Sequence, residues 1–254
     1  MLQQLSVFNL TPSTFSTPDN IIQFPTQSTP RKPHTQQRVS PLRDPELVNK
    51  VYQALLASSR HGLRNASIFA LQLAIGRRTN DILRTTLKTV YDFSTNSIRQ
   101  MITVDEHKTG KTARDLPLNT QTQQILLKYI HTLKVFTPDA LLFPSQKKNS
   151  DGTQRPLNTS SLDGIYKQID SLIDTHISSY APRKTYGYNI YTECMKKHNG
   201  LLPGTDINAL QYVQSVFNHE STSITLRYIG AYDAPATELS ESISQQYDFC
   251  RIEE

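Results

Sequence analysis

FNHESTSITLRYIG, at residues 217–230, is the stretch around which the rest of the chain is organised. His219 stands near its start, a run rich in hydroxyl side chains follows, and Tyr228 lies nine residues after the histidine. Taken alone, this stretch predicts a helix pair in which Tyr228 and Ile229 belong to a hydrophobic core. Whether they do more than pack depends on the polar residues that the upstream chain supplies.

Charge is distributed unevenly along the 254 residues. The net charge is +5, but residues 1–118 carry 15 Lys/Arg against 8 Asp/Glu, and residues 119–254 carry 12 against 14. The last 22 residues hold six acidic residues and one arginine. A basic body with an acidic tail favours a polyanionic partner, with the tail held away from it, although many soluble proteins have a similar balance.

Other compositional features narrow the class of protein. No run approaches the roughly 18 apolar residues of a membrane span, and the first residues lack the basic and apolar regions of a secretory signal. The two cysteines, Cys194 and Cys250, have neither disulfide-framework nor metal-ligand spacing. We therefore expect a cytoplasmic protein without a metal site.

Three segments are predicted along the chain. Residues 1–43 form a basic, proline-rich arm, because residues 1–41 hold six of the 14 prolines and too few apolar side chains to offset the entropy of ordering. The basic end of this arm either tracks along phosphates or is a solvated linker. Residues 44–232 form the folded domain. Residues 233–254 form an acidic tail with an amphipathic helix at 236–249.

The folded domain is predicted to be α+β and mainly helical. Asp44 and Pro45 mark a helix start, and further helices are expected at about 62–75, 77–83, 121–133, 160–173 and 183–197, and after Asp206. Short strands at 89–93, 98–104 and 114–118, joined by tight turns, predict one small three-stranded antiparallel sheet. Residues 147–154 are interpreted as a polar loop.

Three upstream stretches hold polar residues that could form a site together with His219 and Tyr228. IGRRTNDIL, at 75–83, has a glycine, one further residue, an arginine and then an acid three positions later. HKTGK, at 107–111, is a turn between two predicted strands, and RDLPL follows at 114–118. YAPRKTYGY, at 180–188, places an arginine before a short aromatic run.

In this order, the four stretches resemble the catalytic boxes of the tyrosine recombinases, the phage integrase family. The resemblance covers about residues 44–230 and implies that family's catalytic-domain fold. It also implies site-specific recombination of double-stranded DNA through a 3′-phosphotyrosine, without a metal or cofactor. A lone Lys-Thr-Gly turn is otherwise best interpreted as a solvated hairpin.

The resemblance assigns a role to each matching residue. Arg78 and Arg183 hold the non-bridging phosphate oxygens, a task that suits a planar and permanently charged guanidinium. His219 donates a hydrogen bond to the phosphate, and Tyr228 attacks it. Lys108 protonates the leaving 5′-oxygen. The remaining assignments are DNA contacts for Lys111, Arg114 and Lys184, structural support for Asp81, and an exposed position for Arg77.

The sequence departs from the family pattern at two places. Tyr180 stands where histidine is usual, and a phenol can hydrogen-bond a phosphate but is a poor base at neutral pH. Asn218 replaces a glycine before His219. Tyr232 is a competing nucleophile, but its distance from His219 does not fit the pattern.

The layout implies further expectations and leaves two rivals. Only about 43 residues precede the first predicted helix, so the chain resembles the stand-alone catalytic domains of short fimbrial-switch invertases, whose affinity should depend strongly on salt. The family implies a tetramer on DNA, with residues 233–254 contacting a neighbour, and an accessory DNA-bending protein is an open possibility. The rival hypotheses are a non-catalytic DNA-binding regulator with the same fold and a type IB topoisomerase.

Overall fold

The computed structural model describes residues 39–230 except Thr109 and Lys111. The chain divides into residues 1–37 and 38–254, so every described residue belongs to the second unit. The helices are α1 (Pro45–Ala57), α2 (Gly62–Ile75), α3 (Thr79–Leu83), α4 (Leu87–Val90), α5 (Thr120–Ile130), α6 (Thr159–Ile173), α7 (Ala181–Lys197), α8 (Ala209–Phe217) and α9 (Thr222–Ile229). None of them is long and apolar enough to cross a membrane.

The first helix begins where the sequence predicts. Asp44 accepts a hydrogen bond from the Glu46 N–H, and Pro45 occupies the first turn, where its missing N–H has no consequence. The apolar stripe of α1 turns Val51 and Leu55 inward, and both are completely buried. This face packs on α2.

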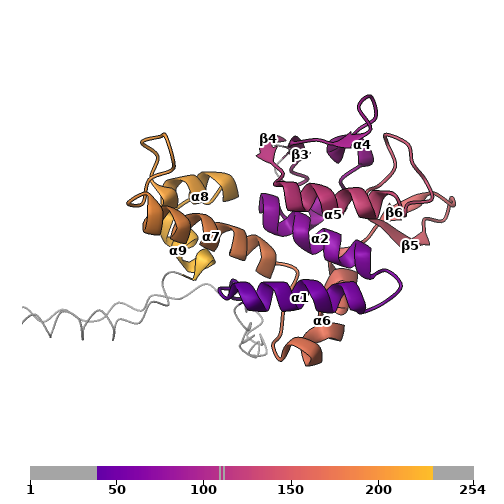
Figure 1. Ribbon diagram of the computed structural model, residues 1–254, viewed down its shortest axis with the longest axis horizontal. Helices are drawn as coiled ribbons and strands as arrows, with labels where there is room; N and C mark the ends of the chain where they lie inside the picture. The colour runs from indigo at the N-terminus through magenta and orange to yellow at the C-terminus, as the bar shows by residue number, and fades with distance from the viewer. Residues whose placement is uncertain (1–38, 109, 111, 231–254) are drawn as a thin grey trace, which may run out of the picture. The chain divides into compact units, whose positions relative to one another are not determined.

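The main core lies where α2 contacts α1 and α5, and α1 contacts α6 (Figure 1). Its fully buried side chains include Phe69 of α2, Leu126 of α5 and Tyr166 of α6. Burying each such side chain stabilises the fold by about 1.5–3 kcal/mol relative to exposure. The Tyr166 hydroxyl donates to Gln72 Oε1 at 2.9 Å, so the polar end of the ring is also satisfied.

The fold class predicted from the sequence is confirmed, but the strands are arranged differently. The described strands are β1 (Tyr91–Asp92), β2 (Ser97–Ile98), β3 (Met101–Asp105), β4 (Thr112–Pro117), β5 (Pro144–Lys148) and β6 (Gln154–Pro156). They form three two-stranded antiparallel sheets, β1–β2, β3–β4 and β5–β6, instead of one three-stranded sheet. The chain bends at Gln100, so β2 and β3 do not continue as one strand. Part of the predicted polar loop at 147–154 belongs to the β5–β6 hairpin.

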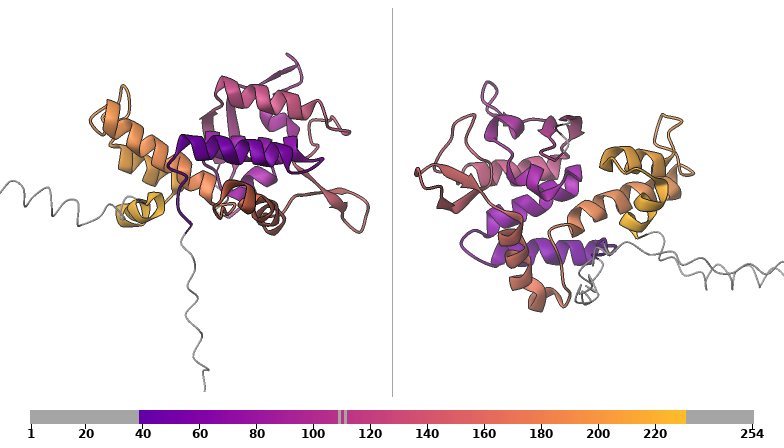
Figure 2. Two further views of the ribbon diagram at one scale, coloured as in Figure 1. Left: turned by 60° about the horizontal axis from the view of Figure 1, so that its bottom comes forward. Right: turned by 180° about the vertical axis from the view of Figure 1, so that it is seen from behind.

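Helices α7, α8 and α9 enclose a second, smaller hydrophobic cluster. Its buried centre is Val213, Phe217 and Ile229. Helix α7 contacts α2 as well as α8 and α9, so it joins the two clusters (Figures 1 and 2). The close approach depends on Gly187, because a Cβ at this position would lie 2.6 Å from the Phe217 ring.

Two helix starts differ from the sequence expectation. The cap of α8 is Asn208, whose side chain accepts from the Leu210 N–H, and not Asp206. The cap of α6 is Asn158, whereas the sequence predicts a helix from about residue 160. Asparagine and aspartate both accept this bond well, so only the path of the preceding loop selects between them.

Most of the predicted arm and all of the predicted acidic tail lie outside the described residues, which exclude 1–38 and 231–254. The predicted helix at 236–249 and the competing Tyr232 therefore lie outside them as well. Residues 39–43, assigned to the arm from the sequence, pack on the domain. Leu42 is buried and its N–H donates to Thr185 Oγ1 at 2.8 Å, while Arg43 donates to the Gly230 carbonyl at 2.7 Å.

Candidate active site

Arg183 and Tyr228 meet in the described part of the chain. Arg183 lies in the first turn of α7 and is only 3% exposed, and its Nε donates to the Tyr228 hydroxyl at 3.1 Å. Nη1 donates to the Gly76 carbonyl at 2.9 Å, and Nη2 reaches the Phe217 carbonyl at 3.5 Å. Three of the five guanidinium N–H groups are thereby used, and no other described residue accepts from the remaining two.

The Phe217 ring supports the groups around it. The Arg183 guanidinium lies over this ring, 4.4 Å from its centroid. The rings of Tyr228 and His219 pack against it with centroid distances of 5.0 and 5.4 Å. Because Phe217 is the last residue of α8 and is 1% exposed, the site rests on the second hydrophobic cluster.

His219 is held immediately after α8. Asn218 adopts the left-handed conformation that ends the helix, with φ of 53°, a conformation that asparagine tolerates better than most residues. The His219 Nδ1 then lies 3.0 Å from Thr225 Oγ1 on α9. Burial, and then the positive charges of Arg183 and Arg78, lower the pKa of His219 to about 4, so the ring is neutral in the free protein at pH 7.

Tyr228 lies on α9 beside His219, with a ring-centroid distance of 4.8 Å. Burial raises the pKa of the Tyr228 phenol, and the charge and hydrogen bond of Arg183 only partly oppose this effect. The phenol therefore remains protonated at neutral pH in the free protein. Its nucleophilicity requires proton removal during the reaction.

Arg78 stands at the start of α3, where its side chain is 20% exposed. Its Nη1 donates to Glu106 Oε2 at 2.6 Å, and the other guanidinium N–H groups remain available. The positive charge of Arg78 contributes to lowering the pKa of both His219 and Tyr228, so Arg78 lies within electrostatic range of both residues.

Arg77 is not the exposed neighbour that the sequence predicts. It is 4% exposed, and its Nη1 donates to Glu106 Oε1 at 3.1 Å. Its Nη2 donates to the Val216 carbonyl of α8 at 2.8 Å. The expectation was wrong because the turn at Gly76, with φ of 59°, directs the next residue between α8 and the β3–β4 hairpin.

The predicted lysine turn is fixed at its first residue. Asp81 Oδ1 accepts the His107 N–H at 2.9 Å, so α3 holds the turn next to Lys108. Lys108 itself is exposed. Lys111 lies outside the described residues, and only the backbone of Arg114, within β4, is described. Among the described residues, Lys108 makes no hydrogen bond or ion pair with Arg183 or Tyr228, and the side chains of Lys111 and Arg114 are not described.

Tyr180 and Lys184 border the same cluster. Tyr180 is the residue before α7 and is 45% exposed, and it is among the groups that raise the pKa of Tyr228. The Lys184 Nζ lies 4.9 Å from the centre of the Tyr228 ring and donates to the Val39 carbonyl at 2.7 Å. Lys184 therefore lies over the face of the Tyr228 ring, and Tyr180 is close enough to influence the pKa of its phenol.

Comparison with known proteins assigns this arrangement to a family. The sequence pattern of the phage integrase family matches residues 44–234. The chain belongs to this family. It is also 28% identical over 193 residues to the probable integrase/recombinase YoeC of Bacillus subtilis strain 168, a match that covers 76% of the present chain and 90% of YoeC.

Solved recombinases share the fold of this integrase-family chain. The XerH site-specific recombinase in its post-cleavage complex with palindromic difH substrate is 18% identical, with a TM-score of 0.52 over 84% of the present chain. The XerA recombinase is 17% identical, with a TM-score of 0.54 over 86% of this chain. The chain spans 55% of the XerH chain and 67% of the XerA chain.

Sequence reasoning missed two residues of the candidate site. Glu106 was passed over because an acid beside a basic turn has no motif of its own, and only its pairing with Arg77 and Arg78 reveals it. Thr225 lay in the hydroxyl-rich run, and its position six residues after His219 is a signal only when the helix start at Thr222 is known.

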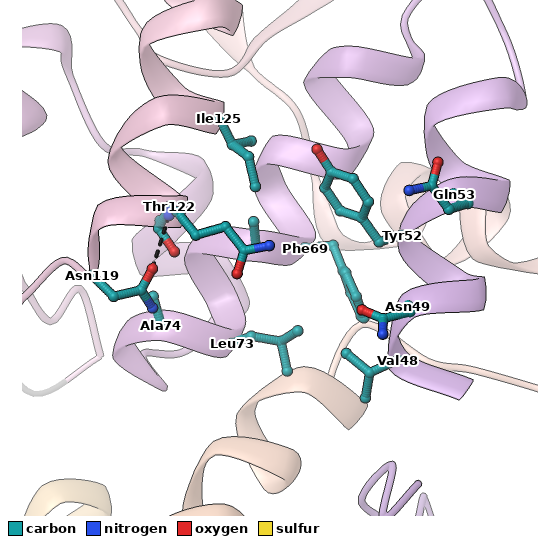
Figure 3. Close-up of a pocket in the computed structure, with 12 residues that line it drawn as sticks. Val48, Asn49, Tyr52, Gln53, Phe69, Leu73, Ala74, Asn119, Thr122 and Ile125 are labelled. Carbon is teal, nitrogen blue, oxygen red and sulfur yellow. Dashed lines mark hydrogen bonds between the residues drawn. The ribbon is translucent and has the colours of Figure 1, made fainter. Parts of the chain in front are cut away.

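A separate pocket of about 220 Å³ lies between α1, α2 and α5 (Figure 3). Phe69, Leu73 and Ile125 line it together with the amides Asn49 and Gln53. It contains no charged side chain and none of the predicted site residues. The pocket is therefore separate from the Arg183–Tyr228 cluster.

Proposed function

We propose that this phage integrase family member is a site-specific DNA recombinase that cuts and rejoins DNA through Tyr228. The observation that carries the proposal is the 3.1 Å hydrogen bond from Arg183 Nε to the Tyr228 hydroxyl, beside the His219 ring. A phenol held by a buried arginine with two remaining N–H groups suits attack on a phosphodiester, because the same guanidinium can hold a phosphate oxygen.

The proposed reaction is an exchange of esters at phosphorus. The Tyr228 oxygen forms a bond to phosphorus while the bond to the 5′-oxygen breaks, which gives a 3′-phosphotyrosine and a free 5′-hydroxyl. Water takes the proton of Tyr228, and Lys108 supplies a proton to the 5′-oxygen. Attack by the 5′-hydroxyl of another strand reverses these steps, and no bond energy is lost.

The phosphate itself changes the state of His219. In the free protein two arginine charges and burial keep the imidazole neutral. A phosphate anion bound between Arg78 and Arg183 offsets those charges and raises the pKa of the histidine. His219 then donates a hydrogen bond to a non-bridging oxygen, and Tyr180 donates a second from the open side.

DNA as the partner agrees with the charge of the chain. The net charge is +5, and the predicted contacts Lys111, Arg114 and Lys184 extend the basic surface beyond the reacting phosphate. Such contacts release counterions, so the affinity should fall steeply as salt rises. We also propose that four copies assemble on DNA and that residues 233–254 of each copy contact a neighbouring copy.

The test is capture of the covalent intermediate. The full chain is incubated with a pool of nicked DNA duplexes that have randomised flanks, so that cleavage next to the nick releases a short fragment and traps the protein. Covalent complexes are recovered in detergent, and mass spectrometry locates the modified residue. We expect a DNA adduct on Tyr228, and none in Tyr228→Phe.

Controls separate this function from its rivals. Tyr232→Phe should retain the adduct, because the proposal assigns the attack to Tyr228, whose hydroxyl accepts from Arg183. Sequence-selective DNA binding without any adduct would make the protein a regulator. Relaxation of supercoiled DNA without a partner site would make it a topoisomerase.

A further inference from the structure

Glu106 connects two arginines at the edge of the Arg183–Tyr228 cluster. Its two carboxylate oxygens are divided between them, with Oε1 on Arg77 Nη1 at 3.1 Å and Oε2 on Arg78 Nη1 at 2.6 Å. The side chains of Arg77 and Glu106 are 5% and 6% exposed, whereas that of Arg78 is 20% exposed. The buried pair therefore lies behind Arg78, and Arg78 is the member that faces solvent.

The Arg77–Glu106 pair is itself anchored on both sides of the site. Arg77 Nη2 donates to the Val216 carbonyl at 2.8 Å, near the end of α8 and three residues before His219. Glu106 lies directly after β3, two residues before Lys108. The Arg77–Glu106 ion pair thus connects the end of α8 to the β3–β4 hairpin, and Arg78 binds the same Glu106 carboxylate.

Electrostatics indicates what the carboxylate does for the neighbouring arginines. Arg77, Arg78 and Arg183 gather in one region, and burial and the charge of Arg183 lower the pKa of Arg77 while Glu106 raises it. Without Glu106, mutual repulsion would push the partly exposed Arg78 toward solvent, because it is the least enclosed of the three. Glu106 uses one of the five N–H groups of Arg78 and leaves the others for a phosphate.

We propose that Glu106, held by Arg77, is a positioning residue that fixes the guanidinium of Arg78 for contact with the reacting phosphate. Arginine loses rotamer entropy when it is ordered, and a prior hydrogen bond removes that cost from the cleavage step. The inference rests on the proposed recombinase function. It assigns to Glu106 no contact with the substrate.

The inference predicts that Glu106→Gln slows cleavage without weakening DNA binding. Glu106→Gln keeps the shape but loses the charge, so the site becomes more positive. We expect its dissociation constant for a duplex of arbitrary sequence to be unchanged or lower. We expect the single-turnover rate of adduct formation to fall about 10- to 100-fold, because a misplacement of about 1 Å can cost that much in rate. General damage to the fold would weaken both.

The matched control is Asp105→Asn on the neighbouring residue. Asp105 is exposed at the end of β3, and its Oδ1 accepts from Thr112 Oγ1 at 2.8 Å, away from the arginines. The substitution removes the same charge from the same hairpin and should leave the cleavage rate within about twofold. Glu106→Asp retains the charge with a shorter reach and should recover part of the rate.

A double-mutant cycle with Arg78→Lys tests whether Glu106 acts through Arg78. If it does, adding Glu106→Gln to Arg78→Lys lowers the rate much less than it lowers the wild-type rate. Equal losses in the two backgrounds, or a wild-type rate in Glu106→Gln, would overturn the inference and leave the proposed function intact. Absence of any adduct with the wild type would overturn both. Thermal unfolding of each variant identifies a loss of fold.

Discussion

Phe217→Leu is expected to damage the candidate site more than the fold. The Phe217 ring contacts Tyr186, His219 and Tyr228 at centroid distances of 6.4, 5.4 and 5.0 Å, and the Arg183 guanidinium lies 4.4 Å above it. An aromatic pair contributes about 0.5–1.5 kcal/mol and a desolvated cation–π contact about 2 kcal/mol. These contacts are not additive, so we expect Phe217→Leu to lower the free energy of unfolding by about 2 kcal/mol.

Phe217→Ala also leaves a cavity in the small cluster of α7, α8 and α9. Phenylalanine-to-alanine changes in cores cost about 3–5 kcal/mol, and we expect a value within that range. Urea denaturation, followed by circular dichroism, measures both variants. The rate of adduct formation should fall at least tenfold in Phe217→Leu, because Arg183, His219 and Tyr228 all pack on this ring.

The control for this change is Phe143→Leu in the main core. Phe143 is completely buried and stacks on Tyr129 at 5.6 Å, and it belongs to the main core, whereas Phe217 and Tyr228 belong to the second cluster. It should lose comparable stability and retain the cleavage rate. If Phe143→Leu and Phe217→Leu reduced cleavage equally, the reasoning that the Phe217 ring supports the site would be refuted.

Three further changes have defined outcomes. Because the pKa of His219 is about 4 when folded and near 6.5 when unfolded, the unfolded chain binds more protons between these values, so stability should fall as pH drops from about 6.5 to 4. Urea titrations across this range should show a weaker fall in His219→Gln. Gly76→Ala should lower the free energy of unfolding by at least about 2 kcal/mol, because φ is 59° and the new Cβ would lie 2.1 Å from the Tyr186 ring; a neutral result in thermal melts would contradict it. Asp81→Ala should speed amide hydrogen exchange at His107, whose N–H it accepts at 2.9 Å, and unchanged exchange would show that the turn holds itself.

Much of this fold follows from local sequence. The cap at Asp44 with Pro45, the apolar stripe of Val51 and Leu55, and the glycine after Ile75 are signals between near neighbours, and the helices form accordingly. The order of the arginine, lysine, arginine and histidine–tyrosine stretches was likewise sufficient to identify the family, which the match over residues 44–234 confirms.

The tertiary structure decided which side chains meet. No spacing rule could place Glu106 against Arg77, because the two are 29 residues apart and their contact depends on how the hairpin packs beside α3. The prediction that Arg77 is exposed was wrong because its acceptors, Glu106 and the Val216 carbonyl, are brought to it only by the tertiary fold. The single predicted sheet became separate two-stranded sheets because a bend at Gln100, a matter of long-range packing, interrupts the strand. Local patterns therefore determined most helices and the candidate site residues, whereas long-range contacts alone determined that Arg78 is held by Glu106 and Tyr228 by Arg183.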